Sequence, residues 1–145
     1  MKNKSVIFVC TGNTCRSPVA EIILKTKLKL EKIEGVKVSS AGISAVAGDK
    51  MSRNSLLALK ELGYKGYAFK SKPLTHAMIK KADMVICMTA RHKLWLNGYD
   101  NVFTIDELTG RGEIIDPYGG DFNLYVQTAY QLEDACNVIL NKYFL

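Results

Sequence analysis

The chain of 145 residues lacks the features that mark several specialised protein classes. It has no hydrophobic run long enough to cross a bilayer, and the short apolar stretch within residues 1–10 is too brief for a signal peptide. It also has no internal repeat, low-complexity tract or linker, so we expect one domain over residues 1–145. With 48% hydrophobic and 23% charged residues, the composition is typical of an ordinary globular protein, and we expect no membrane association.

Metal-binding and disulfide patterns are absent as well. The cysteines have neither paired C-x-x-C spacing nor neighbouring histidines, and they stand at Cys10, Cys15, Cys87 and Cys136. A chain of this length does not need disulfides to fold, so we expect free thiols, a cytoplasmic location, and neither a metal nor another cofactor. His76 and His92 lie in lysine-rich helical segments without a cysteine or an acid at ligand spacing, and we expect both on the surface.

The net charge of +6 favours anionic partners, such as phosphorylated substrates, acidic proteins or nucleic acid. The lysines are scattered, however, and the stretch in which they crowd, residues 25–32, has no aromatic or arginine pattern for reading bases. We therefore expect a solvated basic surface, no nucleic-acid binding, and a monomer.

Strand and helix patterns alternate along the chain. Short apolar runs predict strands at residues 5–9, 36–40, 84–88 and 102–105. Helices are predicted at residues 18–31, 54–62, 76–81 and 91–97, and Trp95 is expected to pack within the last of these. A final helix carries apolar residues at steps of four and three, at Tyr125, Ala129, Leu132, Cys136, Ile139 and Tyr143. The alternation predicts an α/β fold with three layers, a four-stranded parallel sheet flanked by helices, whose site lies at the carboxyl ends of the strands.

The most informative segment follows the first predicted strand. Residues 9–18 read Val-Cys-Thr-Gly-Asn-Thr-Cys-Arg-Ser-Pro, so that Cys10 is followed by five residues and then by Arg16. Backbone N–H groups in such a strand–loop–helix turn converge on one point, and the helix N-terminus adds partial positive charge, which suits a phosphate. Gly12 allows a positive φ, and Asn13 tolerates a left-handed conformation well. Besides Cys10 and Arg16, the expected phosphate-binding loop comprises Thr11, Gly12, Asn13, Thr14, Cys15 and Ser17.

The side chains of this loop predict a covalent phosphatase. A thiolate attacks phosphorus, and the amides, the helix end and Arg16 all favour the negatively charged form of Cys10. The Arg16 guanidinium can bind two phosphoryl oxygens at once, and Ser17 can donate a hydrogen bond to the sulfur when it leaves. A bare C-x5-R match often arises by chance, but the preceding strand and the Ser-Pro helix start make the functional interpretation much the stronger one.

A general acid is needed as well, to protonate the leaving group and later to activate water. Asp116 is the best candidate, because Pro117 favours an extended Asp116 and the glycines at 119–120 mark a loop that can lie over a site. Asp-Pro by itself usually marks only a turn, so this assignment depends on a wider resemblance.

That resemblance is to the low-molecular-weight protein tyrosine phosphatase family, and it covers nearly the full chain. The matching motifs are the loop at residues 10–18, Ser-Ala-Gly at 40–42 after the second strand, and Asp-Pro at 116–117 before the last helix. The resemblance implies phosphorylated protein substrates and a four-stranded parallel sheet flanked by helices.

The same resemblance implies a role for each matching residue. Cys10 would be the nucleophile, Arg16 the phosphate binder and Asp116 the acid and base. The remaining implied roles are loop shaping and thiolate stabilisation by Asn13 and Ser17, redox protection by Cys15, and a pocket wall at Tyr118. Only four residues separate Cys15 from Cys10, so a disulfide that reversibly blocks the nucleophile is conceivable, and a packing role for Cys15 is about as well supported.

Two details resemble the bacterial protein-arginine-phosphatase branch of that family. Tyrosine-directed members often carry a bulkier apolar residue where Thr14 stands, and an aromatic pair after Asp-Pro where this chain has Tyr118-Gly119. Thr14 is β-branched and polar, so it can narrow the mouth against a flat aromatic ring while offering a hydroxyl near the phosphorus. A guanidinium leaving group is slimmer and cationic, and an Asp116 carboxylate can pair with it. We therefore favour phosphoarginine over phosphotyrosine, with tyrosine specificity as the alternative.

Two other activities are disfavoured. An arsenate reductase of the same fold relays oxidation through a further cysteine pair, but Cys87 stands alone near the third strand and Cys136 lies on the apolar stripe of the last helix. A non-catalytic phosphoprotein-binding module would have a broken catalytic set, whereas Cys10, Arg16 and Asp116 are all present.

Overall fold

The computed structural model describes residues 3–145, and its four strands form one parallel sheet in the order β2-β1-β3-β4. The predicted α/β fold with a four-stranded parallel sheet is thereby confirmed. The elements, in chain order, are β1 (Lys4–Cys10), α1 (Ser17–Leu30), β2 (Val36–Gly42), α2 (Arg53–Glu61), α3 (His76–Lys81), β3 (Met84–Cys87), α4 (Ala90–Leu94), β4 (Val102–Thr104), α5 (Ile105–Thr109), α6 (Phe122–Ile139) and the π-helix η1 (Leu140–Phe144).

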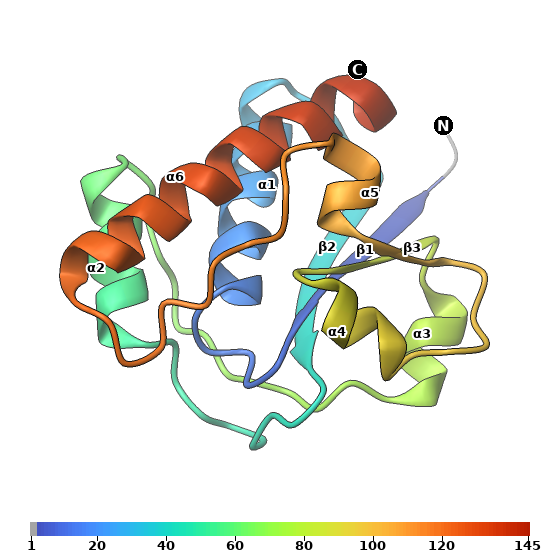
Figure 1. Ribbon diagram of the computed structural model, residues 1–145. Helices are drawn as coiled ribbons and strands as arrows, with labels where there is room; N and C mark the ends of the chain where they lie inside the picture. The colour runs from blue at the N-terminus through green and yellow to red at the C-terminus, as the bar shows by residue number, and fades with distance from the viewer. Residues whose placement is uncertain (1–2) are drawn as a thin grey trace.

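Helices cover both faces of the sheet. Figure 1 shows α1, α2, α5 and α6 on one side, where they form the larger core, and α3 on the other. In β1, Val6 and Phe8 point into the larger core, whereas Ile7 and Val9 point into the smaller one. A strand buried on both faces has no polar side, which explains why β1 and β3 are continuous apolar runs in the sequence.

Side-chain caps set where most helices begin. Thr104 accepts a hydrogen bond from the Glu107 amide while the Glu107 side chain accepts from the Thr104 amide, so β4 ends at Thr104 and α5 begins at once. The strand predicted at 102–105 is therefore one residue too long, and α5 was not predicted at all. Similar caps precede four further helices, at Ser52, Thr75, Thr89 and Asp121.

Two predictions about helix ends are wrong. Helix α4 ends at Leu94 rather than at residue 97, and Trp95, expected to pack, is 74% exposed. At the carboxyl end, α-helical hydrogen bonding stops at Ile139 and a π-helical turn follows, so Tyr143 leaves the buried stripe of α6 and is partly exposed. Among residues 3–145, no helix combines the length and the apolar character needed to cross a membrane.

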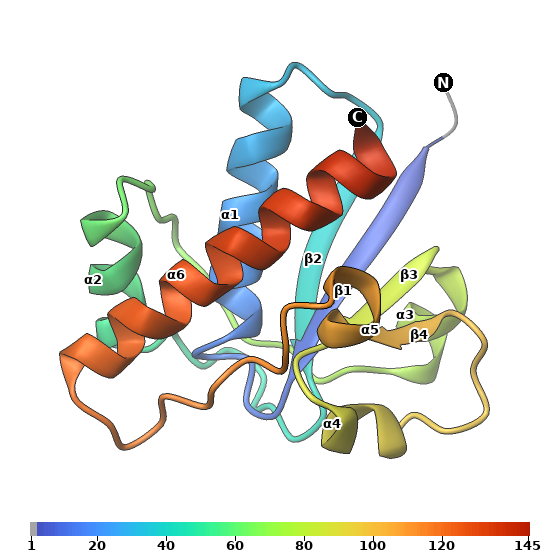
Figure 2. The same cartoon turned by 45° about the horizontal axis from the view of Figure 1, so that its top comes forward.

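The segments that matter for function meet at one end of the sheet. Figure 2 shows the loop after β1, helix α4 and the segment at residues 110–121 gathered at the end where β1 and β2 terminate. All strands are parallel, so this is the carboxyl edge, where open α/β sheets bind ligands.

Candidate active site

The loop from Cys10 to Arg16 joins β1 to α1 and turns its carbonyl groups toward the surrounding segments. Five of these carbonyls accept hydrogen bonds from residues that follow β2 or lie near α2. The pairs are Ile43 N to Cys10 O at 3.0 Å, Ser44 N to Thr11 O at 2.9 Å, Ser71 Oγ to Asn13 O at 2.6 Å, Ser52 N to Thr14 O at 2.9 Å and Ser55 Oγ to Cys15 O at 3.2 Å. Within the described chain, no amide from residue 11 to residue 16 donates to another protein group. These N–H groups are thus available to an anion, as expected of a phosphate loop.

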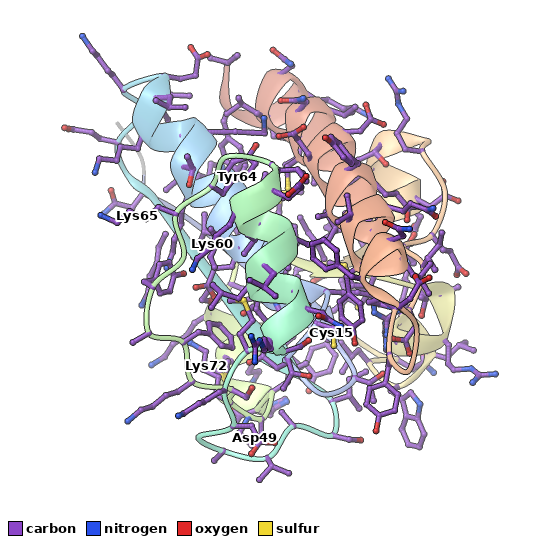
Figure 3. All side chains as sticks on the ribbon, turned by 90° about the vertical axis from the view of Figure 1, so that its left-hand side faces the viewer. Cys15, Asp49, Lys60, Tyr64, Lys65 and Lys72 are labelled. Atoms are coloured by element: carbon purple, nitrogen blue, oxygen red, sulfur yellow. The ribbon has the colours of Figure 1, made fainter. Side chains whose placement is uncertain are left out.

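Close packing keeps this loop in place. A Cβ added to Gly42 would lie 2.6 Å from the Thr11 carbonyl oxygen and 2.9 Å from the Asn13 amide nitrogen, so only glycine fits at this position. On another side of the loop, Figure 3 shows Cys15 beside the N-terminal end of α2, where Ser55 binds its carbonyl. Gly42, the last residue of the Ser-Ala-Gly motif at the end of β2, is therefore required for the loop to pack here.

Asn13 is the structural centre of the loop. It adopts the left-handed conformation with φ 56° and is fully buried. Its side-chain amide donates to Ser17 Oγ at 2.9 Å and to Ser40 Oγ at 3.0 Å, and its Oδ1 accepts from the Lys72 amide at 3.0 Å. Gly12, for which a positive φ was predicted as well, is not among the residues with positive φ, so Asn13 alone makes the left-handed turn in this loop.

A directed hydrogen-bond chain ends at the sulfur of Cys10. The Ser40 hydroxyl donates its hydrogen to Glu21 Oε1 at 2.8 Å. Its oxygen therefore acts as the acceptor in the hydrogen bond from the Asn13 side-chain amide. Ser17 also accepts from Asn13, so its own hydrogen is free for Cys10 Sγ, 2.8 Å away. The chain orients the Ser17 hydroxyl as a donor to sulfur. Glu21 was not identified from the sequence; it is buried and further bonded to Lys25 at 3.2 Å.

Arg16 and Asp116 come together although 100 positions separate them in the sequence. The buried Arg16 guanidinium donates to the Ile114 carbonyl at 3.3 Å and lies 3.7 Å from the Asp116 carboxylate. The Asp116 side chain is 57% exposed, and its Oδ1 accepts from the Tyr118 amide at 3.1 Å. The bond to the Ile114 carbonyl orients the Arg16 guanidinium. The bond from the Tyr118 amide fixes a turn that holds the Asp116 carboxylate at the pocket mouth.

One pocket of about 270 Å³ gathers most of the residues that the sequence predicted. Cys10 is buried at its base, with 2% exposure, whereas Tyr118 at its edge is 83% exposed. The full lining comprises Cys10, Thr11, Gly12, Thr14, Cys15, Arg16, Asp116 and Tyr118. Asn13 and Ser17 lie behind this lining and act on it through hydrogen bonds.

His92 was predicted on the surface, and that prediction is wrong. Its ring is buried next to the loop, with Nε2 2.9 Å from Thr11 Oγ1 and Nδ1 3.1 Å from Thr89 Oγ1. Burial, assisted by the positive charge of Arg16, lowers the pKa of His92 to about 4, so the ring is neutral at pH 7.

The remaining cysteines have no part in the pocket. Cys87 and Cys136 are completely buried in the two cores, and burial raises the pKa of each thiol to about 12. Within residues 3–145, no group of three histidine, cysteine or acidic side chains is arranged to hold a metal ion.

Comparison with known proteins agrees with this geometry. A family model described as "Low molecular weight phosphotyrosine protein phosphatase" matches residues 5–143. The protein-arginine-phosphatase of Bacillus subtilis (strain 168) is 41% identical over 138 residues, which cover 89% of each chain. PtpB of Staphylococcus epidermidis, a low molecular weight protein-tyrosine-phosphatase, is 37% identical over 147 residues, covering 95% of this chain and 98% of its own.

A solved structure supports the same assignment. A mutant of YwlE arginine phosphatase with a phosphorylated active-site serine superposes with a TM-score of 0.88 at 37% identity, and the match covers 97% of each chain. The loop geometry, the family model and these relatives agree. The chain belongs to the low molecular weight phosphotyrosine protein phosphatase family and is a cysteine-dependent protein phosphatase.

Proposed function

We propose that the chain hydrolyses phosphoarginine in proteins through a phosphocysteine intermediate on Cys10. The observation that carries the mechanism is the loop itself. Five of its carbonyls are engaged by surrounding segments, its amides are available, and the buried Cys10 lines the pocket beside a buried arginine. Such an array stabilises the charge that develops on transferring phosphoryl oxygens.

In the first step, the Cys10 thiolate attacks phosphorus while the loop amides and Arg16 hold the phosphoryl oxygens. The bond from phosphorus to the leaving nitrogen breaks, and that nitrogen takes a proton from Asp116. The 3.7 Å contact between Arg16 and the Asp116 carboxylate supports this role, because Arg16 is the side chain proposed to hold the phosphoryl group. Transfer to the enzyme is consistent with the phosphorylated active-site serine in the YwlE mutant.

In the second step, the Asp116 carboxylate takes a proton from water, and the water oxygen attacks phosphorus. The sulfur–phosphorus bond breaks and inorganic phosphate leaves. Ser17, oriented by Asn13, donates to the departing sulfur at a site where the two atoms already lie 2.8 Å apart. This step regenerates the thiolate and the protonated acid.

Selectivity for arginine rests on Thr14. Its side chain borders the pocket, and its Oγ1 lies 3.7 Å from Cys15 Sγ, which borders the same pocket. A threonine here narrows the entrance to an aromatic ring, while the carboxyl group of Asp116, protonated before the first step, can accept a hydrogen bond from a guanidinium through its carbonyl oxygen. The 41% identity to the B. subtilis protein-arginine-phosphatase supports this choice, and the 37% identity to PtpB keeps phosphotyrosine as the alternative.

Kinetics on two substrates separate these possibilities. We expect the parent enzyme to have a higher kcat/KM on a phosphoarginine peptide than on the matching phosphotyrosine peptide. Thr14→Ile removes the hydroxyl and should reverse or reduce this preference by roughly ten- to a hundredfold, since the loss of one polar contact changes selectivity by a few kcal/mol at most. Preference of the parent for phosphotyrosine would show that the arginine assignment is wrong.

Two further variants identify which part of Thr14 acts. Thr14→Val retains the branched shape without the hydroxyl, and Thr14→Ser retains the hydroxyl without the methyl group. If shape excludes the aromatic ring, Ser admits phosphotyrosine and Val does not. If the hydroxyl acts on the phosphoryl group, Val loses phosphoarginine turnover and Ser keeps it.

Cys10→Ser tests the catalytic mechanism itself. We expect it to abolish turnover of an aryl phosphate while phosphate binding is retained, because the loop amides and Arg16 are unchanged. A parent protein without turnover would instead favour a phosphoprotein-binding module.

Cys15 stays a prediction for redox protection. It borders the same pocket as Cys10 and both thiols are free. Mild peroxide would oxidise the Cys10 thiolate to a sulfenic acid, and attack by the Cys15 thiol would then form the disulfide and release water. Intact mass and recovery of activity by dithiothreitol, compared between the parent and Cys15→Ser, test this role. Equal recovery in both proteins would remove it.

A further inference from the structure

His92 makes a contact that the catalytic scheme above does not use. Its ring lies between two threonine hydroxyls, with Nε2 2.9 Å from Thr11 Oγ1 and Nδ1 3.1 Å from Thr89 Oγ1. Only 5% of the residue is exposed. Thr89 is also the N-cap of α4, because its Oγ1 accepts from the His92 amide at 3.3 Å. The ring therefore connects the first turn of α4 to the residue that follows the nucleophile.

Thr11 differs from the rest of the loop in how it is held. The loop carbonyls are bound from the side of β2 and α2, and the side chains of Asn13, Arg16 and Ser17 are fixed by burial. Thr11 is exposed, so packing cannot hold its side chain. Within residues 3–145, its hydroxyl has His92 as its hydrogen-bond partner, and this contact connects the loop to α4 and not to the segments near β2 and α2.

The same end of α4 also contacts the segment that carries the acid. The amide of Ala90 donates to Glu113 Oε1 at 2.7 Å, and the Ile114 amide donates to the Met88 carbonyl at 3.1 Å. Ile114 in turn accepts from Arg16. The start of α4 thus lies between the phosphate loop and the residues that lead to Asp116.

We infer that His92 is a positioning residue: through Thr11 Oγ1 it holds the first turn of the phosphate loop in the geometry that receives the phosphoryl group. This role rests on the proposed function only in so far as the loop binds phosphate. A neutral imidazole offers one donor and one acceptor, and each threonine hydroxyl can take the complementary part, so both contacts are satisfied together. The ring stays neutral mainly because it is buried, and the positive charges of Arg16 and Arg91 add to this effect. The negative charges of Asp116 and Glu113 act in the opposite direction without cancelling it.

Two substitutions at position 92 distinguish positioning from packing. The side-chain amide of glutamine reaches about as far as Nε2, whereas that of asparagine reaches only as far as Nδ1. His92→Gln can therefore keep the bond to Thr11, and His92→Asn can keep only the bond to Thr89. Thr11→Val removes the hydroxyl from the other side of the contact without changing the shape of the side chain.

The measurement is the dissociation constant of inorganic phosphate by calorimetry, together with KM and kcat on p-nitrophenyl phosphate. We expect His92→Asn and Thr11→Val each to weaken phosphate binding by roughly fivefold, the usual effect of one hydrogen bond, and to raise KM more than they lower kcat. The double variant should be no worse than either single variant, and His92→Gln should retain most of the affinity.

Other outcomes would overturn the inference. Additive effects of His92→Asn and Thr11→Val, or unchanged phosphate affinity in Thr11→Val, would show that the contact does not position the loop. Equal losses in His92→Gln and His92→Asn, accompanied by lower melting temperatures, would indicate packing alone. Phosphate affinity is measured without turnover, so the result does not depend on whether the substrate is phosphoarginine or phosphotyrosine.

Discussion

Replacing Asn13 by alanine tests the structural basis of the phosphate loop most directly. The side chain makes three hydrogen bonds, to Ser17 Oγ, to Ser40 Oγ and from the Lys72 amide, and the residue is 0% exposed. Each such bond contributes about 1 kcal/mol net. Alanine must also adopt φ 56°, and the left-handed region costs a residue with a Cβ roughly 1 kcal/mol or more.

These contributions together give a loss of about 4 kcal/mol from the free energy of unfolding. Stabilities of single domains are typically about 5–15 kcal/mol, so Asn13→Ala should remain folded but lie close to its limit. Urea unfolding followed by circular dichroism at 222 nm measures the loss. Asn13→Gly is the matched control, because it loses the same three bonds but adopts the left-handed conformation freely.

We expect Asn13→Gly to be destabilised by about 1 kcal/mol less than Asn13→Ala. Equal losses in the two variants would refute the contribution assigned to backbone strain. A loss below 1 kcal/mol in both would refute the larger claim, that the bonds from Asn13 to Ser17, Ser40 and Lys72 stabilise the loop. Phosphate affinity should fall in both variants, because Ser17 loses the contact that orients it.

Three further outcomes are expected. Gly42→Ala should weaken phosphate binding by roughly tenfold or more, because its Cβ would lie 2.6 Å from a carbonyl oxygen of the loop. Gly63→Ala, strained at φ 88° but with no atom near its Cβ, should lower stability and leave that affinity unchanged. The pKa of His92 is about 4 in the folded protein and 6.5 when unperturbed, so between pH 4 and pH 6.5 the unfolded state binds more protons than the folded state. The free energy of unfolding should therefore fall as pH drops from 6.5 to 4, by about 3 kcal/mol at most, and less steeply in His92→Gln. Cys87 and Cys136 should resist iodoacetamide until the protein unfolds, because burial raises both thiol pKa values to about 12.

Local patterns predicted the parts of the site that lie close together in the sequence. The apolar run of β1, the loop and the Ser-Pro start of α1 follow one another, so Cys10 and Arg16 could be placed by the strand–loop–helix context alone. Asp116 could not be placed in this way, because no local sequence pattern near it indicates a contact with Arg16. The resemblance to a family supplied that contact, and the 3.7 Å separation of the two side chains agrees with it.

The residues that sequence reasoning missed are polar side chains buried by distant segments. His92 lies among lysines and arginine on a short helix, and its neighbours in sequence give no sign that α4 packs against a loop 81 residues earlier. Glu21 similarly belongs to a lysine-rich helix, where an acid four residues before Lys25 looks like a surface pair. Its burial comes from Ser40 on β2 and Tyr67, both of which bind its carboxylate. Such burial is a property of tertiary structure, so the sequence alone could not show it.

The distribution of burial across the site has a consequence for how specificity can change. Cys10, Arg16 and Ser17 are buried, and the loop that carries them is bonded through Asn13 to Ser40 and Lys72 and through Arg16 to Ile114. A substitution among these three residues therefore affects folding as well as activity. The residues at the mouth are Thr14, which is half-buried, and Asp116 and Tyr118, which are exposed. A substitution at the mouth removes few contacts and therefore costs little stability. On the proposal that a few residues at the mouth decide the leaving group, relatives named as arginine and tyrosine phosphatases can share about the same identity with this chain, 41% and 37%.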